Sequence, residues 1–177
     1  NVIPAEVLEA VITGTQEFFD KMKSFGINIT YMGGETADVG DVVRTIAVNG
    51  TMAARWSKSK LITNDKIKPG DVIVGLAGFG QANYEDEHNS GIASNGLTSA
   101  RHDMLHKTYG ARFHESYDSS LDENVVYIGP YLLTDNIQYS PDSYRDNTQF
   151  SSSVGKLLLS PTRTFAPVMK ELLENHF

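Results

Sequence analysis

Two acidic side chains follow a pair of glycines early in the chain. The hexapeptide Gly33-Gly-Glu-Thr-Ala-Asp38 places two carboxylates three residues apart, behind glycines that leave the backbone free to turn. Mg²⁺ is commonly held by one or two carboxylates while it keeps several waters and bridges nucleotide phosphates. A glycine turn with solvated acids is the alternative. Gly33, Gly34, Glu35, Thr36 and Asp38 are therefore a candidate site for Mg²⁺ held by one or both carboxylates and bridging nucleotide phosphates.

A second candidate is the tripeptide Ser94-Asn95-Gly96, which stands where a helical pattern begins. The first backbone N–H groups of a helix lack partners within the helix, and its dipole is positive at that end, so a phosphate binds favourably there. Ser and Asn are also the usual N-cap residues, whatever the function. The same residues therefore suit a phosphate site or ordinary capping.

The third candidate is Arg163, in the first turn of a helix that Ser160 and Pro161 are expected to open as N-cap and first residue. The helix dipole disfavours a cation there by about 0.3–1 kcal/mol. A bound anion would relieve this mismatch, and so would solvation or a pair with a nearby carboxylate. Pro167 is expected to kink the early turns of this helix. Catalytic residues are not assigned.

The elements that would position these residues follow from periodicity. Apolar residues recur every three or four positions over 4–25 and again over 97–109, which predicts two helices, the first closed by Gly26 at C′ and the second, capped by Ser94 or Asn95, closed by Gly110. The segments 27–31, 72–76 and 125–128 have the alternating or apolar character of strands. The chain is therefore predicted to have an α/β or α+β fold.

Turn signals divide the remaining segments. Asn49-Gly50 inside the β-prone stretch 42–56 favours two short hairpin strands, and one long strand with a glycine bulge is the competitor. Pro69 and Gly70 occupy the central positions of a type II turn over 68–71. Residues 81–94 predict a mobile loop, and residues 134–153 predict irregular surface structure.

Composition limits the class of protein. The 177 residues are 40% hydrophobic, carry a formal net charge of −7 and include no cysteine. Clustered Lys and Arg are absent, so a nucleic-acid partner is not expected, and no apolar run approaches the roughly 20 residues that span a membrane. We expect a soluble cytoplasmic protein.

His102 and His106 share a helix face at metal-ligand spacing but lack a metalloprotease signature, so surface histidines are expected.

Four segments together resemble aminoimidazole ribonucleotide synthetase, also called phosphoribosylformylglycinamidine cyclo-ligase. They are Gly33-Gly-Glu-Thr-Ala-Asp38, Lys68-Pro-Gly-Asp-Val-Ile-Val-Gly75, Ser94-Asn-Gly-Leu-Thr-Ser-Ala-Arg101 and Leu158-Leu-Ser-Pro-Thr-Arg-Thr-Phe165. The resemblance implies that residues 1–62 are the end of an N-terminal ATP-binding and dimerisation domain. It implies that residues 63–177 are the beginning of a C-terminal α/β domain.

The resemblance also implies an activity, the ATP-dependent closure of the imidazole ring from formylglycinamidine ribonucleotide in a homodimer. Glu35, with Asp38, would lie near Mg-ATP, and Ser94, Asn95, Gly96 and Arg163 would lie toward the substrate. The family's glycine-rich segment and its Asp-Gly-Val-Gly-Thr-Lys motif have no counterpart here, and Asn1 is not an initiator Met. The chain is therefore expected to be an incomplete portion that is inactive alone.

Departures from the family leave two alternatives open. Residues 39–43 read Val-Gly-Asp-Val-Val in place of the usual Pro-Gly-Met-Tyr, and residues 79–93 and 111–155 are longer than the corresponding family segments. Thiamine-phosphate kinase and selenophosphate synthetase share the Gly-Gly-acid loop but look less similar at 94–96 and 161–163. A binding module without catalytic activity is the third hypothesis.

Overall fold

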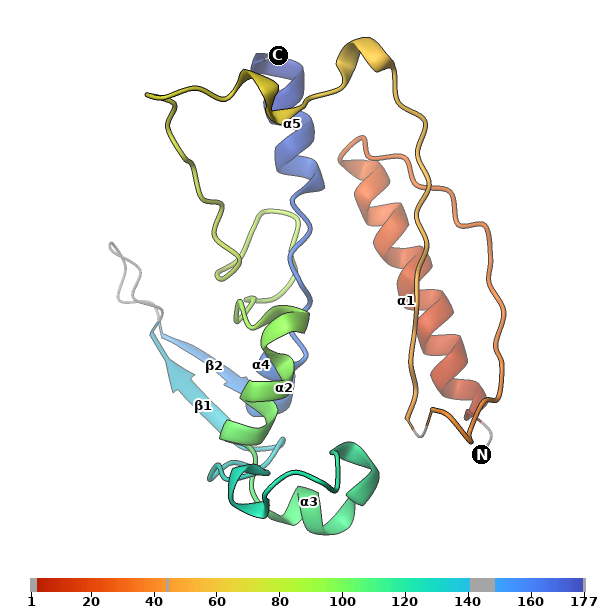
Figure 1. The fold of residues 1–177 in the computed structure, drawn as a ribbon, viewed down its shortest axis with the longest axis vertical. Helices are drawn as coiled ribbons and strands as arrows, with labels where there is room; N and C mark the ends of the chain where they lie inside the picture. Colours follow the sequence, from red (N-terminus) through yellow and green to blue (C-terminus); the bar gives the residue numbers. More distant parts are fainter. Residues whose placement is uncertain (1–2, 44, 141–148, 177) are drawn as a thin grey trace.

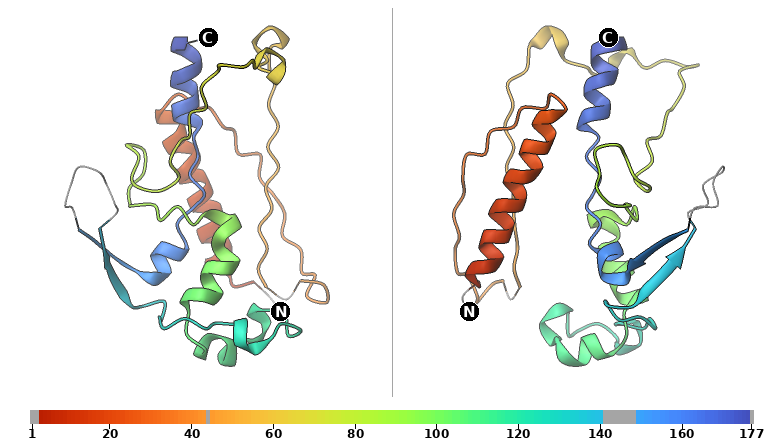
Figure 2. Two further views of the ribbon diagram at one scale, coloured as in Figure 1. Left: turned by 60° about the vertical axis from the view of Figure 1, so that its left-hand side comes forward. Right: turned by 180° about the vertical axis from the view of Figure 1, so that it is seen from behind.

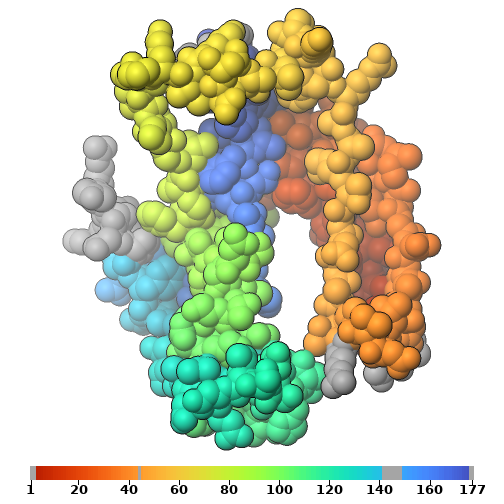
Figure 3. Space-filling view, in the orientation of Figure 1, coloured from red at the N-terminus to blue at the C-terminus, as the bar shows by residue number. Residues whose placement is uncertain are grey.

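The computed structural model describes residues 3–43, 45–140 and 149–176 and shows a mixture of helices with one small sheet. Helix α1 lies beside extended segments, and α2, α4 and the strands gather at a distance from it (Figures 1 and 2). Side chains leave an opening between these two groups (Figure 3). The elements are α1 Ala5–Ser24, η1 Lys58–Lys60, η2 Asn64–Lys66, α2 Ala93–Met104, α3 Thr108–Arg112, η3 His114–Ser116, η4 Glu123–Val125, β1 Asn136–Tyr139, β2 Phe150–Ser153, α4 Val154–Leu158 and α5 Ala166–His176.

Helix α1 confirms the prediction for the N-terminal region. Gly26 follows the helix with φ +77°, the left-handed conformation that glycine adopts at C′. Its amide donates to the carbonyl of Lys23 at 2.9 Å, and the amide of Ile27 donates to Met22 at 3.0 Å. These two bonds are those of a Schellman motif, so the apolar pattern and the terminal glycine together fixed this element.

Among the described residues, the strands predicted over 27–31, 42–56 and 72–76 do not form. Residues 39–43 make a local turn, the rest of these segments belongs to no hydrogen-bonded ladder, and residues 46–57 pass through Asn49-Gly50 without reversing (Figure 1). Val72 and Ile73, in the apolar run 72–76, are 85% and 97% exposed. A strand is stable only when a neighbour pairs with its backbone and covers one face, and here neither condition is met. The predicted hairpin is wrong for the same reason.

The turn between these segments is as predicted. Gly70 has φ +99°, and the amide of Asp71 donates to the carbonyl of Lys68 at 3.2 Å. A positive φ at the third position defines a type II turn. The Asp71 carboxylate also accepts from the Lys68 amide at 3.0 Å, which closes the turn a second time.

The sheet lies where irregular structure was predicted. Strands β1 and β2 pair antiparallel, with Asn136 opposite Ser153 and Tyr139 opposite Phe150. Ile137 and Tyr139 are half buried while their neighbours in β1 are exposed, which is the alternation of a strand with one covered face. The polar composition of 134–153 concealed this pattern, and Pro141 lies outside the described residues.

The helix predicted over 97–109 is two helices. Leu105 ends α2 by turning into the core, where the amide of His106 donates to Tyr131 at 2.9 Å and the amide of Tyr131 donates to Met104 at 3.0 Å. Tertiary pairing thus replaces helical bonds, and Gly110 lies buried inside α3 rather than at a helix end. The buried core cluster consists of Leu105, Val126, Tyr127, Val154 and Leu158.

The predicted strand 125–128 is also wrong. Its first residue ends η4, Glu123–Val125, and Tyr127 takes φ +49°, which no strand residue adopts. The apolar character of the run reflects burial, because Val126 and Tyr127 are core residues. An apolar run of four residues indicates burial more firmly than it indicates secondary structure.

The last helix begins later than predicted. Residues 160–165 are extended, and α5 begins at Ala166, whose amide donates to the Thr164 hydroxyl at 3.3 Å. Ser160 is therefore not its N-cap, and Arg163 precedes the helix. Pro167 lies in the first turn, where the missing N–H removes no helical bond, so no kink is required.

Candidate functional site

The loop over 77–91, which we call the arch, is closed on itself. Gly80 and Asn89 form an antiparallel bridge in which each amide donates to the other's carbonyl, at 2.9 and 2.8 Å. Gly91 has φ +77°, and a Cβ built there would lie 2.9 Å from the Cβ of Phe79. Only a residue without a side chain permits this close approach. The predicted loop is therefore a folded unit.

Residues 157–164, which we call the crossing segment, run against the arch and bind it at several points. The Ser90 hydroxyl donates to the carbonyl of Leu157 at 2.8 Å, and the side-chain amide of Asn89 donates to the carbonyl of Pro161 at 2.8 Å. The Tyr84 hydroxyl donates to the carbonyl of Thr164 at 2.7 Å. Side chains of the arch thus bind a backbone carbonyl at the C-terminal end of α4 and two carbonyls of the extended residues that follow it, which belong to no ladder.

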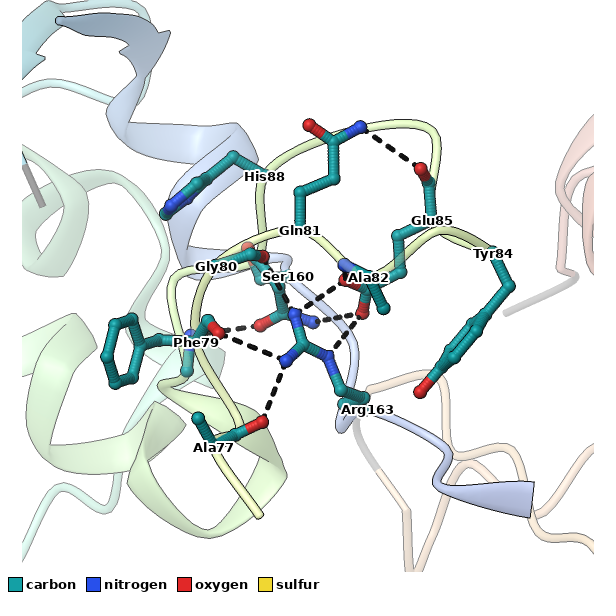
Figure 4. Close-up of polar contacts among 12 residues, drawn as sticks. Ala77, Phe79, Gly80, Gln81, Ala82, Tyr84, Glu85, His88, Ser160 and Arg163 are labelled. Atoms are coloured by element: carbon teal, nitrogen blue, oxygen red, sulfur yellow. Dashed lines mark hydrogen bonds and ion pairs between the residues drawn. The ribbon is translucent and has the colours of Figure 1, made fainter. Parts of the chain in front are cut away.

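The side chain of Arg163 enters the arch from the crossing segment (Figure 4). Nε and one terminal nitrogen donate to the two carboxylate oxygens of Glu85, at 2.9 and 2.6 Å. The terminal nitrogens also donate to the carbonyls of Ala77 at 2.7 Å, Phe79 at 3.0 Å and Gly80 at 2.8 Å. A guanidinium has five N–H donors, so the structure uses all of them.

Burial strengthens this ion pair. The side chains of Arg163 and Glu85 are only 8% and 15% exposed. Burial alone would raise the pKa of the Glu85 carboxyl, but hydrogen bonds from Arg163 and from the Ala82 amide outweigh it and hold that pKa below its usual value. The Glu85 carboxylate in turn raises the pKa of Arg163. Both groups are therefore charged, and each compensates the other.

The start of α2 is held by the crossing segment. The amide of Ser94 donates to the Thr162 hydroxyl at 3.1 Å, and that hydroxyl donates to the hydroxyl of Ser94 at 3.3 Å. Ile92 stands at the N-cap position and has no side-chain oxygen to offer. The predicted capping by Ser94 or Asn95 is wrong, because α2 begins at Ala93 and both residues lie in its first turn. Thr162 supplies the missing acceptor from 68 residues away.

A hollow lies between the arch and strands β1 and β2, with His88 on one wall. The ring of His88 lies 5.3 Å from that of Tyr139 and 4.7 Å from that of Phe150, between ring centres. Its Nδ1 is 3.1 Å from the Tyr139 hydroxyl, and its Nε2 is buried without a partner among the described residues. Burial, and then the charge of Arg163, lower the pKa of His88, so this histidine is neutral at pH 7.

His102 corrects the prediction of two surface histidines. His106 is exposed, but His102 is buried and lies against Tyr127 with ring centres 4.8 Å apart. Burial, and then the neighbouring Arg101, lower its pKa. Within the described residues no group of three or more His, Cys, Asp or Glu side chains that could hold a metal ion is found.

The acidic loop lies apart from the arch. Gly33–Asp38 is part of the extended segment that follows α1 (Figure 1), and Glu35 is exposed there. The Asp38 carboxylate accepts from the amide of Gly40 at 3.1 Å, in a local turn. None of the described polar contacts of Ser94 or Arg163 goes to this loop. The structure thus brings together the second and third candidates but not the first.

Glu85 is the residue that sequence analysis missed. A pair between Arg163 and a nearby carboxylate was one of the three interpretations, and the structure selects it. Glu85, Asp86 and Glu87 are consecutive acids in the sequence, and nothing in their order distinguishes the first from the other two. Only in the closed arch does the Glu85 side chain point toward Arg163, while Asp86 and Glu87 are exposed.

Comparison with known proteins matches this chain to phosphoribosylformylglycinamidine cyclo-ligases. The relative from Pyrococcus furiosus is 35% identical over 130 residues, 71% of this chain and 34% of the relative. The relative from Thermoplasma acidophilum is 33% identical over 59% of this chain and 30% of its own length. That from Methanocaldococcus jannaschii is 43% identical over 42% of this chain and 18% of its own length.

The resemblance to the cyclo-ligases is thereby confirmed. The match with these cyclo-ligases covers about a third of their length or less. No family model matches the chain. Within the described residues, no helix combines the length and apolar character needed to cross a membrane.

Proposed function

We propose that this chain is a portion of an ATP-dependent cyclo-ligase that closes the imidazole ring of aminoimidazole ribonucleotide. ATP would activate the formyl amide oxygen of formylglycinamidine ribonucleotide, a nitrogen of the substrate would attack the activated carbon, and ADP and phosphate would leave. The named relatives support this reaction. The structural observation that carries it is the hydrogen bond between Ser94 and Thr162, because it joins two segments of the family's pattern that lie far apart in sequence.

The substrate side would be the first turn of α2. Ser94, Asn95 and Gly96 are at the positive end of a 12-residue helix, and Ser94 and Asn95 are exposed. Backbone N–H groups and the dipole at such an end favour a phosphate. Arg163 belongs to the same region through the crossing segment, and its part is considered below.

The nucleotide side would be the acidic loop. Glu35 and Asp38 are two carboxylates on exposed backbone, and Mg²⁺ bound with a nucleotide needs few protein ligands, because phosphates and waters complete its octahedron. The donor set therefore suits Mg-ATP, with Glu35 as the metal ligand and Gly33, Gly34, Thr36 and Asp38 around it. Residues 1–62 would end the ATP-binding domain, and residues 63–177 would begin the second domain.

A homodimer would complete the architecture. The extended segments that follow α1 expose large apolar side chains, among them Val48, Met52 and Trp56. Exposed extended backbone of this kind is stabilised when another strand pairs with it. Pairing across two copies would supply that partner and would bring the acidic loop of one copy to a nucleotide cleft.

Isothermal calorimetry tests the proposal. Mg-ATP and formylglycinamidine ribonucleotide would each be titrated into the chain, and we expect heat of binding with at least one of them. Glu35→Gln should weaken Mg-ATP binding, whereas Asp65→Asn, at an exposed acid in η2, should leave it unchanged. If neither Mg-ATP nor formylglycinamidine ribonucleotide gives heat of binding, the result would favour the module without catalytic activity. Tighter binding of thiamine phosphate than of formylglycinamidine ribonucleotide would favour the kinase alternative.

A further inference from the structure

The guanidinium of Arg163 has no N–H donor left for a ligand. All five donors are bonded within the chain, two to Glu85 and three to backbone carbonyls of the arch. Arginine has no acceptor and does not lose its proton in proteins. A phosphate would therefore have to displace one of these bonds, and it would meet the negative charge of Glu85 beside it.

The residue before Arg163 reaches the proposed substrate turn directly. The hydroxyl of Thr162 accepts a hydrogen bond from the Ser94 amide and donates one to the Ser94 hydroxyl. The position of that hydroxyl is set by the crossing segment, which Arg163 fastens to the arch on one side of Thr162 and Asn89 fastens on the other through the Pro161 carbonyl. Thr162 is thus held between two anchored residues.

We propose that Thr162 and Arg163 are positioning residues for the Ser94–Gly96 turn, and that Arg163 does not itself contact the substrate phosphate. The Glu85–Arg163 pair fixes the crossing segment, and Thr162 transmits that position to the first turn of α2. The inference rests on the proposed function for the role of the turn. The coupling of Thr162 to Ser94 does not depend on that function, because it follows from the hydrogen bonds between the two residues.

Glu85→Gln separates positioning from direct contact by the sign of its effect. If Arg163 contacted the phosphate, removing the negative charge of Glu85 would release a cation for the ligand, and formylglycinamidine ribonucleotide would bind more tightly. If Arg163 positions the turn, the same substitution loosens the crossing segment, and binding weakens by about 2- to 30-fold, the usual range for coupling through a network. Tighter binding would overturn the proposal.

Thr162→Val and Thr162→Ser test the second link. Valine has the shape of threonine without the hydroxyl, whereas serine keeps it. We expect the Ser94 amide to exchange with solvent about 5- to 10-fold faster in Thr162→Val, the factor for one hydrogen bond, and substrate to bind more weakly, with both restored in Thr162→Ser. A change in melting temperature alone would not produce the rescue in binding.

The two proposals fail in different ways. If the wild-type chain binds neither Mg-ATP nor formylglycinamidine ribonucleotide but Ser94 exchanges faster in Thr162→Val, the proposed function falls and the coupling stands. If the wild-type chain binds substrate but the Ser94 amide, followed by NMR, is unchanged in Thr162→Val, the positioning role is overturned. It is also overturned if exchange rises while the dissociation constant of substrate stays the same.

Discussion

The carboxylate of Glu85 and the guanidinium of Arg163 come from positions 78 residues apart and meet through two hydrogen bonds of 2.9 and 2.6 Å. The pair is largely withdrawn from water, and with the hydrogen bonds of Tyr84, Asn89 and Ser90 it joins the 15-residue arch to the crossing segment. Buried ion pairs of this kind add little over an apolar pair but are costly to break, because removal of one partner strands a charge. Removal of either side chain of this pair should therefore lower the free energy of unfolding more than removal of an exposed charge.

Arg163→Met should destabilise the chain by about 3–5 kcal/mol, because Glu85 would remain buried without a counter-charge. The free energy of unfolding would be measured by urea titration. The matched control is Lys156→Met, since Lys156 pairs with Glu87 at 2.7 Å but both side chains are more than half exposed, at 61% and 65%. An exposed pair contributes about 0–1 kcal/mol. Equal losses in the two variants would show that the Arg163 pair is not buried in solution.

Two histidines, His102 in the core and the half-buried His88, should make the free energy of unfolding fall as the solution is acidified. Burial lowers the pKa of His88 and of His102 in the folded chain, so between the unfolded value of 6.5 and the lower folded value the unfolded state binds more protons. Stability is then fully present above pH 6.5 and is lost as the pH falls through the folded pKa.

Urea titrations at pH 7.5 and 5.5 would measure this loss. His102→Phe keeps a ring against Tyr127 and removes the titrating group, so its stability should depend less on pH over this window. His106→Phe, at an exposed position, should keep the dependence of the wild-type chain. A dependence that is the same in His102→Phe as in the wild-type chain would contradict the assignment.

The first helix and the turn at 68–71 were predictable because the signals that specify them are local. Apolar spacing and Gly26 determine α1, and Pro69-Gly70 determines the turn, without reference to distant residues. The strand predicted over 72–76 does not form, and local signals could not show this, because a ladder needs a partner that the sequence does not name. The same applies to β1: its polar composition predicted irregular structure, but pairing with β2 makes it a strand.

The candidate site shows the same division. Sequence analysis selected Ser94 and Arg163 but placed both at helix starts, one marked by Ser94 or Asn95 and the other by Ser160 and Pro161. The dipole argument for Arg163 failed because α5 begins at Ala166, and the extended segment before it is fixed by contacts with the arch. The dipole at α2 remains relevant, because Ser94 and Asn95 are in its first turn. Contacts between distant segments, rather than local propensity, determined which prediction held.

Two adjacent leucines provide a test of the core. Leu158 belongs to the buried cluster and is 4% exposed, whereas Leu159 is 77% exposed. Leu158→Ala should lower the free energy of unfolding by about 2–5 kcal/mol, through lost burial and the cavity left behind. Leu159→Ala should change it by less than about 0.5 kcal/mol, as for other surface substitutions. If Leu159→Ala is the more damaging of the two, Leu159 is covered in solution, for example by a second copy of the chain.

Two glycines should respond to alanine in opposite directions. At Gly129 a Cβ would overlap the carbonyl carbon and oxygen of Met104, which are backbone atoms at the end of α2 and cannot rotate away. The backbone at Gly129 is also fixed, because its amide donates to the carbonyl of Leu105 at 3.1 Å. Gly129→Ala must therefore push α2 off the segment that carries Val126 and Tyr127, at a cost of about 1–3 kcal/mol or more.

Gly14 is the matched control, because it lies within α1 with nothing within 4 Å of its added Cβ. Alanine is the better helix former by about 0.5–1 kcal/mol, so Gly14→Ala should raise the free energy of unfolding by that amount. Thermal and urea unfolding of both variants would give the two signs directly. A tolerated alanine at 129 would mean that residues 128–129 do not pack against α2, and the core cluster around Tyr127 would then have to be arranged differently.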